Sequence, residues 1–451
     1  MEKSFSKHIE YELQEKKAFL EANTGYKEKY SNIVTDVDKI QYLETLYNAM
    51  PTNYEDIISP KNFEQEYGRL DSYTINDMLI NSWDSFTKRN PNLNIRNVVK
   101  DEVQKAMKCK DPKYGHATYI CEDCDKTYTV PFTCKSRFCT SCAIKYQMDR
   151  AINISEKLID CKHRHVVFTI PQELRIYFRA IPNLVDVLFK AAQETILYRF
   201  NEINKSKKFV PGIIMVLHTF SRSLNWNPHI HCLVTEGGSS AKSTLLDDIW
   251  KQVTHFNYEA FRKSFQKVLL DLMKQKLKKV LSPKDFNIFK NLVDYLYKNF
   301  DNGFYVRAKS DFKDGKYAVK YLIRYFNRPP IASSHILFYD GDYVVFYYQR
   351  HEDDQYVVKK VHIDEFFKML IIHIPEKNFK MLRYAGIYSS HKCQNFDKIQ
   401  KKFTTLCIQI MRKHANWRDR IKATFNRDPL ICPHCKKKLT FFNIYIAKLT
   451  S

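Results

Sequence analysis

The stretch Pro228-His229-Ile230-His231-Cys232-Leu233-Val234 places two histidines on either side of one apolar residue. The β-branched and apolar residues around them predict a β-strand, in which alternate side chains point to the same face. His229 and His231 would then lie side by side, with Ile230 on the other face. Two imidazoles in this arrangement form half of a divalent-metal site, although an isolated His-x-His is more often a pair of ordinary histidines.

The neighbouring sequence predicts an antiparallel sheet around this stretch. His165 to Pro171 has the pattern of a buried strand that ends at proline, and Ile213 to Phe220 predicts a second strand. Because only residues 221–228 separate that second strand from His229, the two strands are expected to form a hairpin. The hairpin would bring His218 beside the histidine pair. There it would be an accessory metal ligand, a phosphate contact or a packed strand histidine.

A row of tyrosines follows further along the chain. Tyr317, Tyr321 and Tyr325 recur every four residues, the spacing of one face of a helix, and Pro329 would end that helix. The same spacing also suits an aromatic stripe that packs against a core. Close to a metal site, however, the hydroxyl groups become candidate nucleophiles. The arginines among them are candidate phosphate contacts: Arg324 and Arg328.

The two stretches together have the parts of a nuclease that forms a covalent bond to nucleic acid. A tyrosine hydroxyl is a poor nucleophile at neutral pH because its pKa is near 10. A divalent ion held by His229 and His231 would polarise the phosphate that the tyrosine attacks. The products would be a phosphotyrosine and a free hydroxyl. Because the bond energy is kept, the step is reversible and suits the rejoining of strands.

Two C-x-x-C pairs predict a zinc site upstream of the histidines. Cys121 and Cys124 form the first pair, and Cys139 and Cys142 form the second, with 14 residues between the pairs. Four thiolates at such spacings are typical of tetrahedral zinc. We therefore expect these four cysteines to hold one structural zinc ion.

Further metal-binding residue types lie outside these two pairs. Cys109, His116 and Cys134 either complete a second site with a borrowed ligand, or the two cysteines are buried small residues. Cys432 and Cys435 form one more C-x-x-C pair near residue 430. One pair supplies only two ligands, so the sequence leaves zinc binding there open.

The charge of the chain indicates a polyanionic partner. The formal net charge is +23, from 73 Lys and Arg against 50 Asp and Glu. Residues 377–451 carry 17 basic and 3 acidic residues, whereas residues 1–100 carry 13 basic and 16 acidic residues. An excess of this size is the electrostatic footprint of nucleic-acid binding.

The sequence places the protein in the cytosol. No apolar run of 18 residues is present, and the first residues lack the apolar core of a secretory signal. Twelve cysteines in a cytosolic chain favour metal sites over disulfides. We therefore expect a cytoplasmic, nucleoid-associated protein with no membrane partner.

The pattern of segments predicts four regions. We expect a helical N-terminal region in residues 1–104, with helices at Phe5 to Leu20 and Val37 to Met50, followed by a zinc-binding module in residues 105–150. Residues 160–350 would form the catalytic domain, with a helical excursion at about 241–300. Residues 351–451 would be a basic, mainly helical C-terminal region that contains the last C-x-x-C pair.

Four segments in this order resemble a known family. They are His165 to Pro171, His218-Thr219-Phe220, Asn227 to Val234, and Tyr321-Leu322-Ile323-Arg324-Tyr325, preceded by the cysteines of residues 121–142. Together they look like the rolling-circle insertion-sequence transposases of the IS-ninety-one type, in the HUH (His-hydrophobic-His) endonuclease superfamily. The resemblance covers about residues 105 to 390.

This resemblance implies an α+β fold with a central antiparallel sheet and flanking helices, after a zinc-binding module. It implies that His229 and His231 bind Mg²⁺ or Mn²⁺. It also implies that Tyr321 and Tyr325 nick single-stranded DNA at element ends and become joined to the 5′ phosphate. Tyr317 is an extra member of the row and leaves the register open. A third metal ligand is unassigned, and the second C-x-x-C pair lacks the proline that the family tends to have.

Two other functions fit parts of the sequence. An HUH replication initiator or conjugative relaxase shares the chemistry but acts on a plasmid origin. A zinc-dependent DNA-binding protein with a decayed HUH core would lack the activity altogether. The zinc module favours the transposase over the first alternative, and the intact histidines and tyrosines argue against the second.

Overall fold

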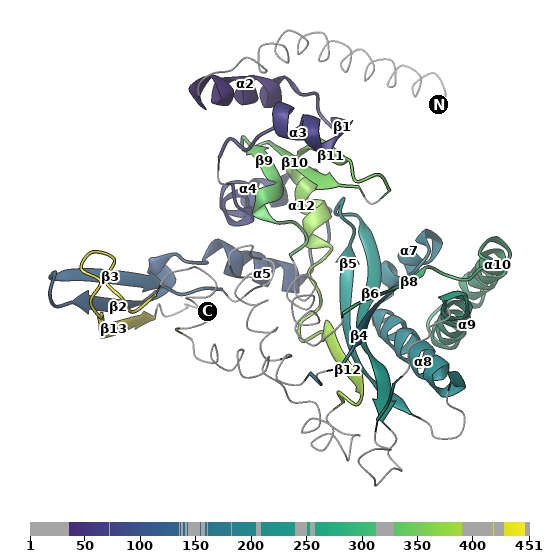
Figure 1. Cartoon of the computed structure of the whole chain (residues 1–451). Coiled ribbons are helices and arrows are strands. Elements are labelled where there is room, and N and C mark those ends of the chain that lie inside the picture. Colours follow the sequence, from purple (N-terminus) through teal and green to yellow (C-terminus); the bar gives the residue numbers. More distant parts are fainter. Residues whose placement is uncertain are drawn as a thin grey trace, which may run out of the picture.

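The computed structural model describes residues 36–71, 73–134, 136, 139, 142, 154, 158–159, 161–181, 183–203, 209–239, 250–252, 258–312, 329–350, 352–389, 418 and 428–446. Within these residues the chain forms helices and three antiparallel sheets (Figure 1). The α+β class with a central antiparallel sheet is therefore confirmed. The predicted helix at Phe5 to Leu20 lies outside the described residues.

The largest sheet carries the histidine stretch in its middle. Its strands are ordered β12-β5-β6-β4-β8, and a short β7 also pairs with β6. The bounds are β4 (His163–Thr169), β5 (Val210–Phe220), β6 (Trp226–Ser239), β7 (Trp250–Gln252), β8 (Val306–Phe312) and β12 (Leu382–Gly386). As predicted, β5 and β6 form an antiparallel hairpin.

The two faces of this sheet differ because side chains alternate along each strand. Ile230, Cys232 and Val234 of β6 belong to a buried apolar core that also includes helix residues. The helices lie together on one side of the sheet in Figure 1. Their bounds, with those of the turn before α7, are η2 (Gln172–Leu174), α7 (Arg175–Ala180), α8 (Val185–Ile203), α9 (Tyr258–Leu277) and α10 (Pro283–Asn299). His229 and His231 alternate with the core residues and so occupy the opposite face.

A second sheet joins the N-terminal region to residues far along the chain. Its order is β1-β11-β10-β9, with β1 (Glu55–Ile58), β9 (Ile336–Tyr339), β10 (Tyr343–Gln349) and β11 (Tyr356–His362). The hairpin of β9 and β10 turns at Asp340-Gly341-Asp342. The pairing of Glu55 with Lys359 was not predicted, and it corrects two expectations. The N-terminal region contains a strand, and the described part of residues 351–451 contains three strands and a helix.

Helices cover this second sheet and are fastened to it by polar contacts. The bounds are α2 (Asp36–Ala49), α3 (Pro60–Glu66), α4 (Ile75–Arg89), α5 (Asn97–Met107), η3 (Ser333–His335) and α12 (Ile363–Ile371). The buried ammonium group of Lys360 donates to the carbonyl oxygens of Tyr47, at 2.8 Å, and Met50, at 2.9 Å. These carbonyls lie at the end of α2, where the helix dipole favours a cation.

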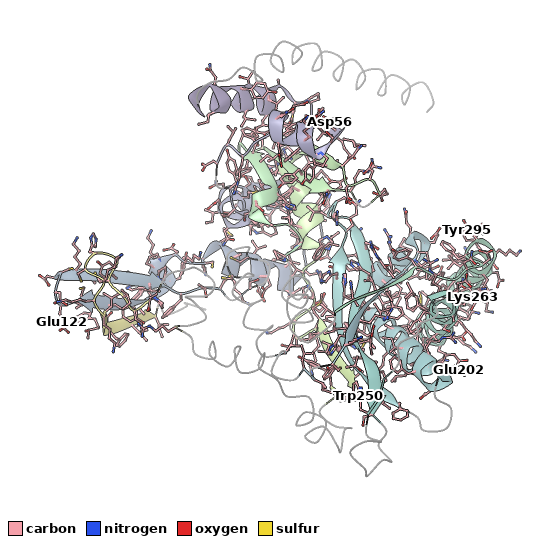
Figure 2. The ribbon with its side chains drawn as sticks, in the orientation of Figure 1. Asp56, Glu122, Glu202, Trp250, Lys263 and Tyr295 are labelled. Atoms are coloured by element: carbon pink, nitrogen blue, oxygen red, sulfur yellow. The ribbon has the colours of Figure 1, made fainter. Side chains whose placement is uncertain are left out.

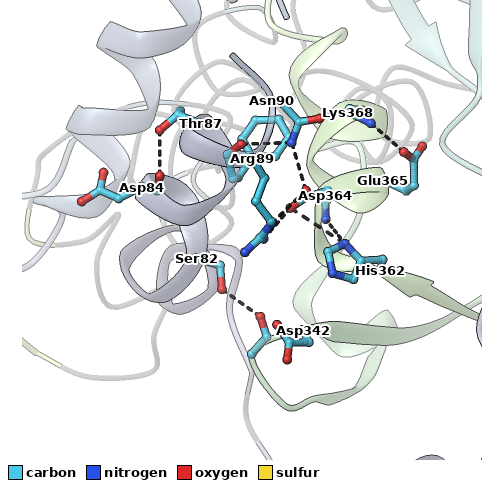
Figure 3. Close-up of polar contacts among 12 residues, drawn as sticks. Ser82, Asp84, Thr87, Arg89, Asn90, Asp342, His362, Asp364, Glu365 and Lys368 are labelled. Atoms are coloured by element: carbon cyan, nitrogen blue, oxygen red, sulfur yellow. Dashed lines mark hydrogen bonds and ion pairs between the residues drawn. The ribbon is translucent and has the colours of Figure 1, made fainter. Parts of the chain in front are cut away.

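A charged clamp connects α4 to the beginning of α12 (Figure 3). Arg89 donates to both carboxylate oxygens of Asp364, from Nε at 3.1 Å and from Nη2 at 2.6 Å. The side-chain amide of Asn90 donates to the same carboxylate at 2.9 Å. Burial tends to raise the pKa of Asp364, but these hydrogen bonds and the charge of Arg89 outweigh it and lower the pKa.

The third sheet stands out from the rest of the molecule as an arm (Figure 1). It has the order β13-β2-β3, and the bounds are η1 (Pro112–Tyr114), β2 (Gly115–Cys121), β3 (Lys126–Pro131) and β13 (Thr440–Ile446). β2 and β3 form a hairpin, and β13 pairs with the other edge of β2.

Among the helices that the structure describes, none is long and apolar enough to cross a membrane.

Candidate functional site

Three histidines meet on the face of the large sheet that lies away from α8, α9 and α10. His229 and His231 come from β6, and His218 on β5 lies directly opposite His229. One ring nitrogen from each of the three lies within 4.8 Å of the others. The predicted side-by-side placement of His229 and His231 therefore agrees with the structure, and the hairpin brings His218 to the pair. Three converging imidazole nitrogens have the chemistry of a divalent-metal site.

Hydrogen bonds orient the two histidines of strand β6. Nδ1 of His229 donates to the carbonyl oxygen of Asn227 at 2.7 Å, so its Nε2 carries a lone pair. Nδ1 of His231 lies 2.9 Å from Nε2 of His165 on the neighbouring strand β4. Such partners orient imidazoles toward a metal ion.

Burial keeps these histidines neutral near pH 7. It lowers the pKa of His229 to about 4, and the positive charge of Arg175 lowers it further against the opposing effect of the Asn227 hydrogen bond. Burial also lowers the pKa of His231, together with the neighbouring histidines. Neutral imidazole is the form that binds a metal ion, so the site is prepared for one.

Polar atoms without a partner lie in the segments that adjoin the histidines. Nε of Arg175, Oε2 of Glu173, Nε1 of Trp226 and Oδ1 of Asn227 are buried and have no hydrogen-bond partner among the described residues. Buried polar groups without a partner are uncommon in native proteins and point to a bound water, ion or ligand, or to a catalytic role. Burial lowers the pKa of Arg175, but a guanidinium group stays charged at neutral pH. Arg175 is thus a candidate anion contact.

The sequence interpretation missed Arg175, although a signal for it existed. Thr169 at the end of β4 pairs with His229, so the residues that follow Thr169 must lie near the histidines. Arg175 begins α7, which packs against β6. The expected order of the strands, combined with the position of Arg175 shortly after Thr169, would have placed it at the site.

The predicted nucleophiles lie outside the described residues. Residues 313–328 contain Tyr317, Tyr321 and Tyr325 together with Arg324 and Arg328. The described chain leads directly to them, because β8 ends at Phe312 beside His163 of β4. Their roles therefore stay predictions.

The structure brings four cysteines together near the base of the arm. Cys109 follows α5, Cys134 follows β3, and Cys139 and Cys142 complete the group. The Sγ–Sγ distances include 3.3 Å for Cys109 and Cys142, 3.5 Å for Cys134 and Cys142, and 3.7 Å for Cys139 and Cys109. A tetrahedron with Zn–S bonds of 2.3 Å has edges of about 3.8 Å. The group therefore fits a structural zinc ion.

A second group lies at the tip of the arm and corrects the expected ligand set. Cys121 and Cys124 meet Cys432 and Cys435, with all four sulfurs within 4.8 Å, and do not meet Cys139 or Cys142. The reason is the hairpin ladder from His116–Pro131 to Cys121–Lys126, whose five steps separate the base of the arm from its tip by about 17 Å. Figure 2 labels Glu122 at this outer tip.

The remaining candidates at the arm do not join either cysteine group. Nδ1 of His116 donates to the carbonyl oxygen of Pro112 at 2.8 Å, and its ring lies 5.3 Å from that of Tyr445. His434 lies between Cys432 and Cys435, and its Nε2 is 3.4 Å from Nζ of Lys126. Spacing predicted the pairs Cys121/Cys124 and Cys139/Cys142, but it did not predict which other cysteines join each pair.

Comparison with protein families gives two matches. The family described as "Transposase zinc-binding domain" matches residues 78–170, which contain six of the grouped cysteines. The family described as "Putative transposase" matches residues 212–395, which contain all three histidines of the site. The zinc-binding domain and the four-sulfur groups together support structural zinc.

Two curated relatives are transposases by name. The transposase for insertion sequence element IS801 from Pseudomonas savastanoi pv. phaseolicola is 28% identical over 355 residues, which cover 77% of this chain and 84% of the relative. The putative transposase y4qJ from Sinorhizobium fredii (strain NBRC 101917 / NGR234) is 26% identical over 137 residues, 30% of this chain and 34% of the relative. No solved structure matches the chain. The chain is therefore a homologue of the transposases of the IS801 and IS-ninety-one type, and it carries both their zinc-binding domain and their putative transposase domain.

Proposed function

We propose that the protein is a transposase of an IS801-type element that nicks and rejoins single-stranded DNA at the element ends. The observation that carries the proposal is the convergence of His218, His229 and His231 on one face of a sheet whose edge strand leads into the tyrosine row. The names of the two relatives favour a transposase over a replication initiator or relaxase with the same chemistry.

His218, His229 and His231 would hold one Mg²⁺ or Mn²⁺ ion through the ring nitrogens that lie within 4.8 Å of one another. When bound, that ion supplies a Lewis acid that polarises the scissile phosphate. His218 would be the third ligand that the sequence left unassigned. Three protein ligands leave other coordination positions for the phosphate oxygens, as a catalytic site requires.

The proposed cleavage is a transesterification. The tyrosine hydroxyl loses its proton as its oxygen forms a bond to phosphorus, the bond between phosphorus and the 3′ oxygen breaks, and the 3′ oxygen takes up a proton, so that no net proton is gained or lost. Arg175 would contact a phosphate oxygen next to His229, where its unpartnered Nε is available. Two tyrosines would allow one to hold a cleaved 5′ end while the other attacks a second strand.

A nicking assay with tyrosine variants tests this proposal. The purified protein, an oligonucleotide from the element end and Mn²⁺ should yield a covalent protein–DNA adduct and a free 3′ hydroxyl. Tyr321→Phe and Tyr325→Phe should each retain some nicking, because the other hydroxyl can substitute, and the double variant should form no adduct. Tyr305→Phe, an exposed tyrosine just before β8, is the matched control and should behave as wild type.

Four results would contradict the assignment. Adduct formation by the double variant, or an adduct peptide that carries only Tyr317, would show that the register is wrong. Activity in only one of the single variants would show that one tyrosine alone is catalytic. Wild-type protein that binds the oligonucleotide without cutting it would favour the non-catalytic DNA-binding function.

A further inference from the structure

The cysteine group at the tip of the arm joins segments that are far apart in the sequence. Cys121 and Cys124 lie at the turn between β2 and β3, whereas Cys432 and Cys435 lie in a turn just before β13. More than 300 residues separate the two halves, and Sγ of Cys121 lies 3.4 Å from Sγ of Cys435. The matches to both transposase families end before residue 396, so neither includes the second half.

The two turns have the same local geometry. In each, the residue after the second cysteine adopts a left-handed conformation, with φ of 47° at Asp125 and 62° at Lys436. The N–H of Cys124 donates to the carbonyl of Cys121 at 3.3 Å, and the second turn is closed by an isolated bridge between Ile431 and Lys438. Two such turns facing each other present four sulfurs in a closed arrangement, as in structural zinc sites.

The distances and the surroundings of the group fit a zinc ion. The Sγ–Sγ distances of 3.4 Å for Cys121 and Cys435 and 4.0 Å for Cys432 and Cys124 lie on either side of the about 3.8 Å of a zinc–thiolate tetrahedron. The hydroxyl of Tyr128 donates to Sγ of Cys432 at 3.2 Å, a contact that stabilises a thiolate.

Without a metal ion, the contacts around these four cysteines would stabilise the tip of the arm only weakly. Its buried core consists of Cys121, Cys432 and Leu439, with four partly buried residues packed against it. Every residue of β13 is exposed, including Phe442 at 62% and Ile446 at 70%. An ion pair between Lys437 and Asp123 also links the two halves, but both side chains are well exposed and such pairs contribute little. So small a core normally needs a metal or a disulfide to fold.

We propose that Cys121, Cys124, Cys432 and Cys435 bind a second structural zinc ion, which fastens residues 428–446 to the arm. We call this group the zinc clasp. With four thiolate ligands the ion has no open position, so its role is to hold β13 against β2. Because thiolates bind the metal, zinc uptake releases protons, and strong chelators should detach β13.

Metal analysis of the full-length protein tests the stoichiometry. Wild type should contain two zinc ions per chain, and the double variant Cys432→Ser/Cys435→Ser should contain one. His434→Ala changes the residue between the two cysteines without removing a sulfur and should keep both ions. A wild type with one zinc ion, or a double variant with two, overturns the proposal. A disulfide found between any two of the four cysteines in freshly purified protein overturns it as well.

Hydrogen exchange measured by mass spectrometry tests the fastening itself. In wild type, the amides that join β13 to β2 should be protected, and in the double variant their exchange should rise to that of an open strand. The β5–β6 hairpin should stay protected in both proteins, which shows that the catalytic domain is folded. Unchanged protection of β13 in a variant that has lost one zinc ion would refute the proposal that zinc holds β13 against β2. Neither measurement depends on DNA cleavage. A negative result here would therefore refute the zinc clasp without refuting the proposed function, and a negative nicking assay would not refute the zinc clasp.

Discussion

At the scale of single residues, hydrogen bonds to neighbouring groups orient the histidines of the candidate site. The carbonyl of Asn227 fixes the tautomer of His229, because a carbonyl oxygen can only accept. Nε2 of His165 lies 2.9 Å from Nδ1 of His231 and orients that ring. One nitrogen of each of the three rings lies within 4.8 Å of the others, an arrangement that would reduce the cost of ordering them around an ion.

We predict graded effects on the binding of Mn²⁺ by histidine variants. His218→Ala, His229→Ala and His231→Ala each remove a ligand and should abolish measurable binding and nicking. His165→Ala leaves the ligands in place and should weaken the affinity by about 10- to 100-fold, as for other residues that orient ligands. Titration calorimetry measures the Mn²⁺ affinity of each variant. His116→Ala, which lies on the arm, is the control, and wild-type binding by His231→Ala would contradict the assignment.

Arg175 should act on the phosphate and not on the metal ion. Arg175→Ala should lower the nicking rate by about 100-fold, the scale of one lost charged contact in a transition state, and leave Mn²⁺ affinity within a few-fold. Arg175→Lys should restore part of the rate, because it keeps the charge but loses the planar fork. Arg179→Ala, further along α7 and exposed, serves as the control. A loss of Mn²⁺ binding in Arg175→Ala would show a structural role instead.

The histidine pair could be predicted from the sequence because a strand has a period of two residues, so His229 and His231 must share a face. His218 followed from the short link between two strands. The cysteine partners could not be predicted, because a C-x-x-C pair fixes only half of a tetrahedron and says nothing about which other half it meets. Only the hairpin ladder, which separates Cys121 from Cys139, decides that.

At the scale of elements, the charged clamp between α4 and α12 holds two distant parts of the chain together. Arg89→Ala should lower the free energy of unfolding at pH 7 by about 0.5–1 kcal/mol, as expected for a partly exposed pair with good geometry. Since the clamp lowers the pKa of Asp364, its contribution is present above the ordinary pKa of an aspartate, about 4, and is lost as the pH falls below it.

Urea unfolding of wild type and Arg89→Ala between pH 7 and pH 3 measures this contribution. The difference between the two proteins should shrink toward zero at the acidic end. Lys368→Ala is the matched control, because it breaks only the exposed pair with Glu365 on α12 (Figure 3). A difference that stays constant with pH would show that Arg89 acts through packing.

Local patterns predicted β4, β5 and β6 of the central sheet, whereas β7 and β12 were not predicted. β1 and β11 were not predicted as partners, because Glu55 and Lys359 carry no local signal that joins them. Strand pairings between residues so far apart in the sequence are determined by the packing of the folded chain. The local sequence of either strand does not indicate its partner. The same holds for β13 and β2.

At the scale of the whole molecule, the charge of +23 should govern DNA binding. If six basic side chains contact phosphates, the logarithm of the affinity for single-stranded DNA falls with the logarithm of salt with a slope of about −4, or roughly 300-fold between 50 and 200 mM. Fluorescence anisotropy with a labelled oligonucleotide measures the slope. The slope should be alike for element ends and scrambled sequences, and a slope near zero would contradict electrostatic binding.

The two cysteine groups also differ in when their members become available during synthesis. Cys109 and Cys142 are 33 residues apart, so the first group is complete soon after its first member leaves the ribosome. Cys121 and Cys435 are 314 residues apart, and at 5–20 residues per second the second group must wait roughly 15 to 60 s for its last member. During that interval Cys121 and Cys124 are thiols on a nascent chain without their final partners. The arm therefore matures in two stages, and the second stage can begin only after the sheet that carries the histidines has been translated.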